Sequence, residues 1–80
     1  QAPTHLLIIP KKPIPKLSDA SAEDKELLGH LMWVAGEVAR DIGLEETFRL
    51  VTNNGAGAGQ SVFHLHLHLL SGRPLQWPPG

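Results

Sequence analysis

The chain has 80 residues, of which 41% are hydrophobic and 19% are charged, and its formal net charge is −1 at pH 7. This balance excludes a disordered acidic or basic tail and gives no sign of a surface that coats nucleic acid or an anionic membrane. Cysteine is absent, which excludes a disulfide framework, a thiolate nucleophile and every cysteine-based metal site. We therefore expect a cytoplasmic protein that binds neither nucleic acid nor membrane.

The first predicted element is a buried strand over His5–Ile9, because a short, β-branched-rich apolar run ends there at Pro10. The following segment, Lys11–Leu17, contains two prolines and is expected to be an extended connection with solvated lysines.

From Ala22 to Ile42 the hydrophobic period becomes helical, and the apolar side chains fall within an arc of roughly 160°. Ser21 and Asp24 have the spacing of a capping box, and Gly43 is suited to end the helix. The arc contains Leu27, Leu28, Leu31, Met32, Val34, Ala35, Val38, Ala39 and Ile42.

Two glycines inside this helix, Gly29 and Gly36, are seven positions apart and therefore lie on one side, near Met32 and Trp33. Such a small-residue groove lets a second helix approach closely, so we expect a homodimer. A domain of this size also buries only about 60% of its unfolded surface, which leaves its stability marginal. We therefore expect a partner subunit or further chain to add stability.

Two more strands are predicted, over Thr47–Asn53 and Val62–Leu70, with a glycine-rich loop over Asn54–Ser61 between them. Neighbouring strands joined by a short loop pair in antiparallel fashion. Residues 72–80 contain three prolines and are expected to be irregular. The order strand, helix, strand, strand predicts an α+β fold, with one long helix packed on an antiparallel sheet, as a single domain over residues 1–80.

Three of the five histidines alternate with leucines in the last strand. His64, His66 and His68 share one face, since side chains of a strand alternate sides, and the intervening leucines face the core. Successive imidazoles are then ~6.6–6.8 Å apart at their Cα atoms, and the outer two are ~13 Å apart. No carboxylate is near them in sequence.

A zinc site is one possible use of this row, but ligands must converge to about 2.0–2.1 Å from the ion. At most two of the three could bind one ion, and a ligand such as His5 would have to complete the set. A serine triad built on Ser61 lacks an evident carboxylate to orient its base. The remaining option is a histidine nucleophile that attacks phosphorus, and the middle residue, His66, is the geometrical choice.

The loop before this strand supplies a second signal. Its glycines permit positive φ angles, so backbone amides can point at phosphate oxygens. The loop lacks the Gly-Lys-Ser/Thr of a Walker A motif, and a strand rather than a helix follows it. Because it leads directly into the histidine row, we expect Gly59, Gln60 and Ser61 to enter the same site as the nucleophile.

The run HLHLHLL is similar to the signature of the histidine triad (HIT) superfamily. The resemblance extends through QAPTH, IPKKPI, the LLGHL helix, GQSVFHLHLHLL and the closing WPPG. Its ending and its Gly-Gln-Ser most resemble the Hint branch, the histidine triad nucleotide-binding proteins. The resemblance implies a homodimeric purine nucleoside phosphoramidase that needs no cofactor or metal. Alternatives are a non-catalytic zinc-binding or interaction dimer and a diadenosine-polyphosphate hydrolase.

By the same resemblance, His66 forms a covalent nucleotidyl-histidine, His68 contacts the α-phosphate, His64 orients the site and His5 joins the proton network. The implied substrate-binding residues are Asn53, Gly59, Gln60, Ser61, His66, His68 and Trp77, with Ser61 close to the leaving amine and Trp77 reaching the partner subunit's pocket.

Family members carry a few dozen residues before the equivalent of Gln1, including strands and the side chains that hold base and ribose. We expect residues 1–80 to be the C-terminal two-thirds of such a domain, and an upstream segment to complete its sheet. Thr52 and Asn54 differ from the residues usual in the family, and we expect little mechanistic consequence.

Overall fold

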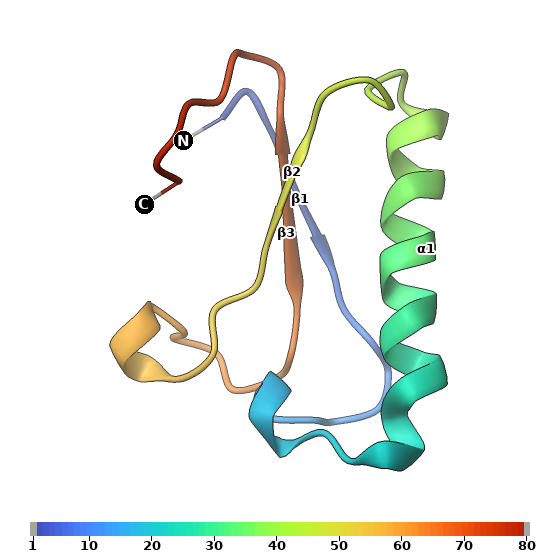
Figure 1. The fold of residues 1–80 in the computed structure, drawn as a ribbon, viewed down its shortest axis with the longest axis vertical. Helices are drawn as coiled ribbons and strands as arrows, with labels where there is room; N and C mark the ends of the chain where they lie inside the picture. The colour runs from blue at the N-terminus through green and yellow to red at the C-terminus, as the bar shows by residue number, and fades with distance from the viewer. Residues whose placement is uncertain (1, 80) are drawn as a thin grey trace.

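Three strands form one antiparallel sheet in the computed structural model, which describes residues 2–79. They are β1 (Thr4–Ile8), β2 (Arg49–Val51) and β3 (Leu67–Ser71), and β3 lies between the other two. The predicted antiparallel pairing of the last two strands is confirmed, with Val51 opposite His68. The predicted α+β fold is also confirmed, because one long helix lies against this sheet (Figure 1).

The last strand is shorter than predicted, because residues 62–66 lie outside β3. A strand needs a neighbour to pair with, and both neighbours have ended: β1 stops at Ile8, and β2 stops at Val51 before the glycine loop. The chain nevertheless keeps the alternation of a strand, since Leu65 is buried between two half-buried histidines.

The long helix, α1 (Lys25–Asp41), follows a single 3₁₀ turn, η2 (Ala22–Asp24). The predicted capping box is present, since the backbone N–H of Ser21 donates to Oδ2 of Asp24 at 2.9 Å. The other carboxylate oxygen of Asp24 accepts from Nζ of Lys12 at 2.5 Å, so the expectation that this lysine is only solvated is wrong. Gly43 ends the helix as predicted, with φ at +77°.

Hydrophobic side chains of α1 and of the sheet meet in one core. Leu31, Ala35 and Ala39, spaced four residues apart, are buried there. The core cluster consists of Ile8, Ile14, Leu31, Ala35, Ala39, Leu65, Leu67 and Leu69. Two members of the predicted arc are exposed instead, Met32 and Ile42, because Met32 lies at the edge of the arc and Ile42 follows the last helical residue. Within residues 2–79, no helix is long and apolar enough to cross a membrane.

The face of the sheet opposite α1 is where the remaining segments gather. The tail after β3 and the loop that contains the short turn η3 (Ala56–Ala58) both lie on this side, at opposite ends of the sheet (Figure 1). The connection with the turn η1 (Leu17–Asp19) passes below the sheet toward α1. The loop and the tail therefore border the sheet face that α1 does not cover (Figure 1).

Candidate active site

The three histidines lie on the sheet side that faces away from the core. His64, His66 and His68 are half-buried, whereas Leu65, Leu67 and Leu69 are at most 8% exposed. The predicted division of these residues between two faces is confirmed. Hydrophobic burial of Leu65, Leu67 and Leu69 under α1 therefore fixes which way the imidazoles point.

The ring of His66 is oriented by the backbone of its own segment. Its Nδ1 lies 2.7 Å from the carbonyl oxygen of His64. A carbonyl oxygen only accepts hydrogen bonds, so Nδ1 carries the proton and donates. The other ring nitrogen, Nε2, then carries the lone pair. A neutral imidazole held in this tautomer can act as a nucleophile through Nε2.

His68 is the histidine of the row that a side chain of the neighbouring strand β1 contacts. Nε2 of His5, on β1, lies 2.8 Å from Nδ1 of His68, and the two ring centroids are 5.0 Å apart. The ring of His66 meets that of His68 edge-on, at a centroid distance of 4.9 Å. The structure thus brings three of the predicted residues into direct contact.

Burial lowers the pKa of His68 below its ordinary value of 6.5, and repulsion by the positive forms of His66 and His5 lowers it further. Protonation of three adjoining imidazoles would place like charges side by side. His68 is accordingly neutral at neutral pH, with one ring nitrogen able to donate and the other to accept.

His64 is used differently from the other two. Its Nε2 donates to the carbonyl oxygen of Pro10 at 2.8 Å, which ties the start of the histidine row to the chain two residues after β1 ends. The next residue, Leu65, donates its backbone N–H to Ile14 at 2.7 Å. The proline-rich connection after β1 therefore supports the histidine row where the sheet no longer does.

The glycine loop has the backbone freedom that the sequence predicts. Gly55 and Gly59 have φ angles of +92° and +95°, in the region that residues with a Cβ rarely adopt. A Cβ at Gly59 would lie 3.8 Å from Nδ2 of Asn53, so the end of the loop borders that side chain. Asn53, directly before the loop, is half-buried, and Ser61, at the end of the loop, is exposed.

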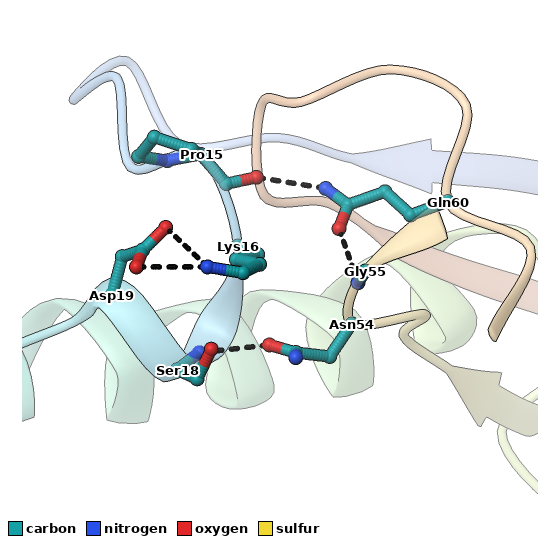
Figure 2. A network of polar contacts seen from close by, with 7 residues as sticks. All are labelled: Pro15, Lys16, Ser18, Asp19, Asn54, Gly55 and Gln60. Atoms are coloured by element: carbon teal, nitrogen blue, oxygen red, sulfur yellow. Dashed lines mark hydrogen bonds and ion pairs between the residues drawn. The ribbon is translucent and has the colours of Figure 1, made fainter. Parts of the chain in front are cut away.

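Gln60 is buried, with 4% of its surface exposed, and its side chain joins the loop to the connection after β1. Oε1 accepts from the backbone N–H of Gly55 at 2.8 Å, and Nε2 donates to the carbonyl oxygens of Pro15 and Val62 at 2.7 and 3.0 Å. Figure 2 shows the amide lying between the loop and Pro15. The structure gives Gln60 a loop-fixing role, and its predicted contact with substrate stays a prediction.

Asn54 makes a second link between the same two segments. Its Oδ1 accepts from the backbone N–H of Ser18, in the turn η1, at 2.8 Å, close to the ion pair between Lys16 and Asp19 (Figure 2). The loop is therefore held to the chain after β1 at both of its ends, by Asn54 and by Gln60.

The tail approaches the site from the side of β2. Arg49 donates from a guanidinium nitrogen to the carbonyl oxygen of Gln76 at 2.9 Å, a contact that no sequence pattern predicts. Trp77 is 82% exposed beside β2, and its predicted approach to a partner subunit stays a prediction. A cleft of about 290 Å³ between tail and sheet is bordered by Arg49, His5 and His68.

Within residues 2–79, no group of three or more histidine, aspartate or glutamate side chains is arranged to hold a metal ion. His5, the residue that had to complete a zinc site, is hydrogen-bonded to His68.

The chain is similar to known proteins of one family. The model of the HIT domain matches residues 1–75. An uncharacterised HIT-like protein of Synechocystis is 65% identical over 80 residues, which is all of this chain and 70% of that protein. The crystal structure of a HIT family hydrolase from Legionella pneumophila superposes with a TM-score of 0.96 at 53% identity, covering all of this chain and 72% of that one.

A histidine triad nucleotide-binding protein from Candida albicans is similar at a TM-score of 0.75 and 29% identity, over 96% of this chain and 61% of that one. The family match therefore covers nearly the whole chain, and it includes the alternating histidines, the glycine loop and the strand that carries His5. On these grounds the chain belongs to the HIT family.

Proposed function

We propose that this protein is a hydrolase that cleaves the P–N bond of purine nucleoside 5′-phosphoramidates and releases a nucleoside monophosphate. The observation that carries the proposal is the 2.7 Å contact between Nδ1 of His66 and the carbonyl oxygen of His64, because it leaves Nε2 free to attack. The names of similar proteins support hydrolysis and nucleotide binding, since they include HIT family hydrolases and a histidine triad nucleotide-binding protein.

The proposed reaction has two displacements at phosphorus. In the first, the Nε2 lone pair of His66 forms a bond to the α-phosphorus, and the bond from phosphorus to the amine breaks as the amine takes up a proton from solvent. In the second, water attacks phosphorus and gives a proton back to solvent, the bond to Nε2 breaks and the nucleoside monophosphate leaves. Ser61, exposed at the end of the glycine loop, is the proposed neighbour of the departing amine.

His68 is proposed to bind a phosphate oxygen. In the tautomer that this role requires, Nε2 of His5 donates to Nδ1 of His68, and Nε2–H of His68 is left to donate to the phosphate. The neutral state that burial favours at His68 is compatible with this donation. Asn53 and Gly59 are proposed to complete the phosphate side of the site from the loop.

An apolar depression supports a nucleoside substrate. A hollow of about 160 Å³ is lined by Leu7, Ile9, Val62, His64 and His66. Leu7 and Ile9 are 54% and 52% exposed on the histidine face of the sheet. Apolar walls beside a polar reactive group are typical of small-molecule sites, and a purine ring has the flat apolar surface that such walls bind.

We also propose that the protein is a cytoplasmic homodimer that pairs through α1. Trp33 is 62% exposed on this helix, and a Cβ at Gly29 would contact nothing within 4 Å, so this side is open to a partner. Sedimentation analysis tests the pairing, with a monomer as the contrary result.

Hydrolysis assays test the activity. We expect the protein to release AMP from adenosine 5′-phosphoramidate faster than from diadenosine triphosphate, and His66→Ala to abolish both reactions. Glu45→Ala, exposed in the turn after α1, is the control and should remain active. Faster cleavage of the dinucleotide would favour a diadenosine-polyphosphate hydrolase, and wild-type inactivity toward both would favour an interaction protein.

A further inference from the structure

The side chain of Thr52 makes direct contact with the backbone of the proposed nucleophile. Its Oγ1 donates to the carbonyl oxygen of His66 at 2.8 Å. Thr52 comes directly after the last residue of β2, and His66 directly before the first residue of β3. The hydroxyl therefore binds the histidine at the position where the ladder between these two strands has ended.

Two further hydrogen bonds hold His66 and its neighbour Leu65 in place. On the other side of the residue, the backbone N–H of Leu65 donates to Ile14 at 2.7 Å, and the ring itself donates from Nδ1 to His64 at 2.7 Å. Of the three bonds, only that from Thr52 depends on a side chain outside the histidine row. Removing the Thr52 hydroxyl would take this donor away from the carbonyl oxygen of His66 while leaving the other two bonds in place.

Thr52 also borders an apolar hollow under the histidine row. The hollow, of about 150 Å³, is lined by Leu17, Leu28, Leu31, Met32, Thr52, Leu65 and Leu67. Leu65 and Leu67 are the two neighbours of His66 in the chain. A threonine thus contributes a hydroxyl that binds His66 and a methyl group that packs, and these two contributions can be separated by substitution.

We propose that Thr52 is a positioning residue, which holds the peptide of His66 so that ring Nε2 stays aligned with the phosphorus to be attacked. The inference rests on the proposed function, because alignment matters only if His66 is the nucleophile. A small displacement of the backbone moves a ring nitrogen away from its line of attack, and reactions that depend on alignment are sensitive to such displacements. The sequence alone predicted little mechanistic consequence for Thr52, and its contact with His66 argues otherwise.

Two substitutions separate the hydroxyl from the methyl group. Thr52→Val keeps the shape of the side chain and removes the donor, so kcat with adenosine 5′-phosphoramidate should fall roughly three- to tenfold, while KM changes less than about twofold. Thr52→Ser keeps the donor and removes the methyl group, so it should retain kcat within about twofold although the enlarged hollow lowers its Tm.

The reverse pattern, with a slow serine variant and an unchanged valine variant, would overturn the inference, because activity would then follow packing. Equal kcat values in all three proteins would overturn it as well. A second readout is independent of substrate: by NMR, the Nδ1 proton of His66 should exchange with water faster in Thr52→Val than in the wild type and in Thr52→Ser.

These two readouts distinguish failure of the inference from failure of the proposed function. A wild type that cleaves neither the phosphoramidate nor diadenosine triphosphate refutes the proposed function, and proton exchange at His66 then decides whether Thr52 positions the ring. Unchanged exchange in Thr52→Val refutes the positioning role whatever the activity.

Discussion

His66 receives its orientation from the backbone of His64 and not from the imidazole of His64. The carbonyl oxygen of His64 accepts from Nδ1 of His66 at 2.7 Å, while the His64 ring is turned to the carbonyl oxygen of Pro10 at 2.8 Å. The first histidine of the row thus has two separate functions, one carried by its peptide and one by its side chain.

This separation predicts a mild phenotype for His64→Ala. The substitution removes the bond to Pro10 but leaves the peptide that sets the tautomer of His66, so turnover should fall yet remain measurable. The lost hydrogen bond should lower the free energy of unfolding by about 1 kcal/mol. Steady-state kinetics and urea denaturation check both effects. Loss of turnover as complete as in His66→Ala would show that the His64 ring takes part in the chemistry.

His5→Ala should raise the pKa of His68. Burial is the main cause of the lowered pKa, and the substitution exposes the ring while also removing repulsion by the positive form of His5. An NMR titration of His68 in both proteins measures the shift. An unchanged or lower pKa would contradict the contact between the two rings.

The sign of the His68 effect on stability follows from its lowered pKa. The folded protein binds the proton of His68 less tightly than the unfolded chain does. The contribution of His68 to the free energy of unfolding is therefore complete above pH 6.5 and declines as the pH falls below that value. We therefore expect plots of Tm against pH, measured between pH 5 and 8 for the wild type and for His5→Ala, to differ in slope only below pH 6.5.

Gly59→Ala should weaken substrate binding. A residue with a Cβ at φ of +95° is strained by about 1–2 kcal/mol, and its Cβ would lie 3.8 Å from Nδ2 of Asn53. We expect a higher KM and a lower Tm. Gly57→Ala is the matched control, because Gly57 has neither a positive φ nor an atom within 4 Å of its added Cβ. Equal effects of the two substitutions would contradict the proposed role of the loop.

Asp24→Asn should destabilise the fold in a pH-dependent way. The hydrogen bond from Lys12 and the backbone bond from Ser21 hold the pKa of Asp24 below 3.8. A carboxyl group with a lowered pKa stabilises the folded state above its unfolded pKa, and the contribution is lost as the pH falls through the folded value. The Tm difference from wild type should be present at pH 7 and shrink below about pH 4.

Asp19→Asn is the control for that experiment, since Asp19 forms an exposed i,i+3 pair with Lys16. Exposed pairs of this kind contribute little to stability. A larger loss of Tm in Asp19→Asn than in Asp24→Asn would contradict the assignment of Asp24 as the anchor of the helix start.

Local patterns predicted the helix, its first and last turns and the two faces of the histidine row, because each depends on residues a few positions apart. The extent of β3 could not be read in the same way. Residues 62–66 alternate like a strand, but a strand also requires partners, and neither β1 nor β2 continues beside them.

The contacts that support the site were missed for a similar reason. Thr52 meets His66, Gln60 meets Pro15 and Lys12 meets Asp24 across 12 to 45 residues of chain. No periodicity links such pairs, and their partners are mostly backbone carbonyl groups, which every residue has. The histidine pattern, in contrast, identified His66 and His68, and the family resemblance added His5; the fold does bring these three residues together.

The central claim is a transient bond between His66 and phosphorus, and rapid quenching followed by mass spectrometry tests it most directly. During turnover of adenosine 5′-phosphoramidate, we predict a protein adduct of one adenylyl group that localises to His66 and is absent in His66→Ala. An adduct on His68 or Ser61, or turnover in His66→Ala at the wild-type rate, would contradict the account.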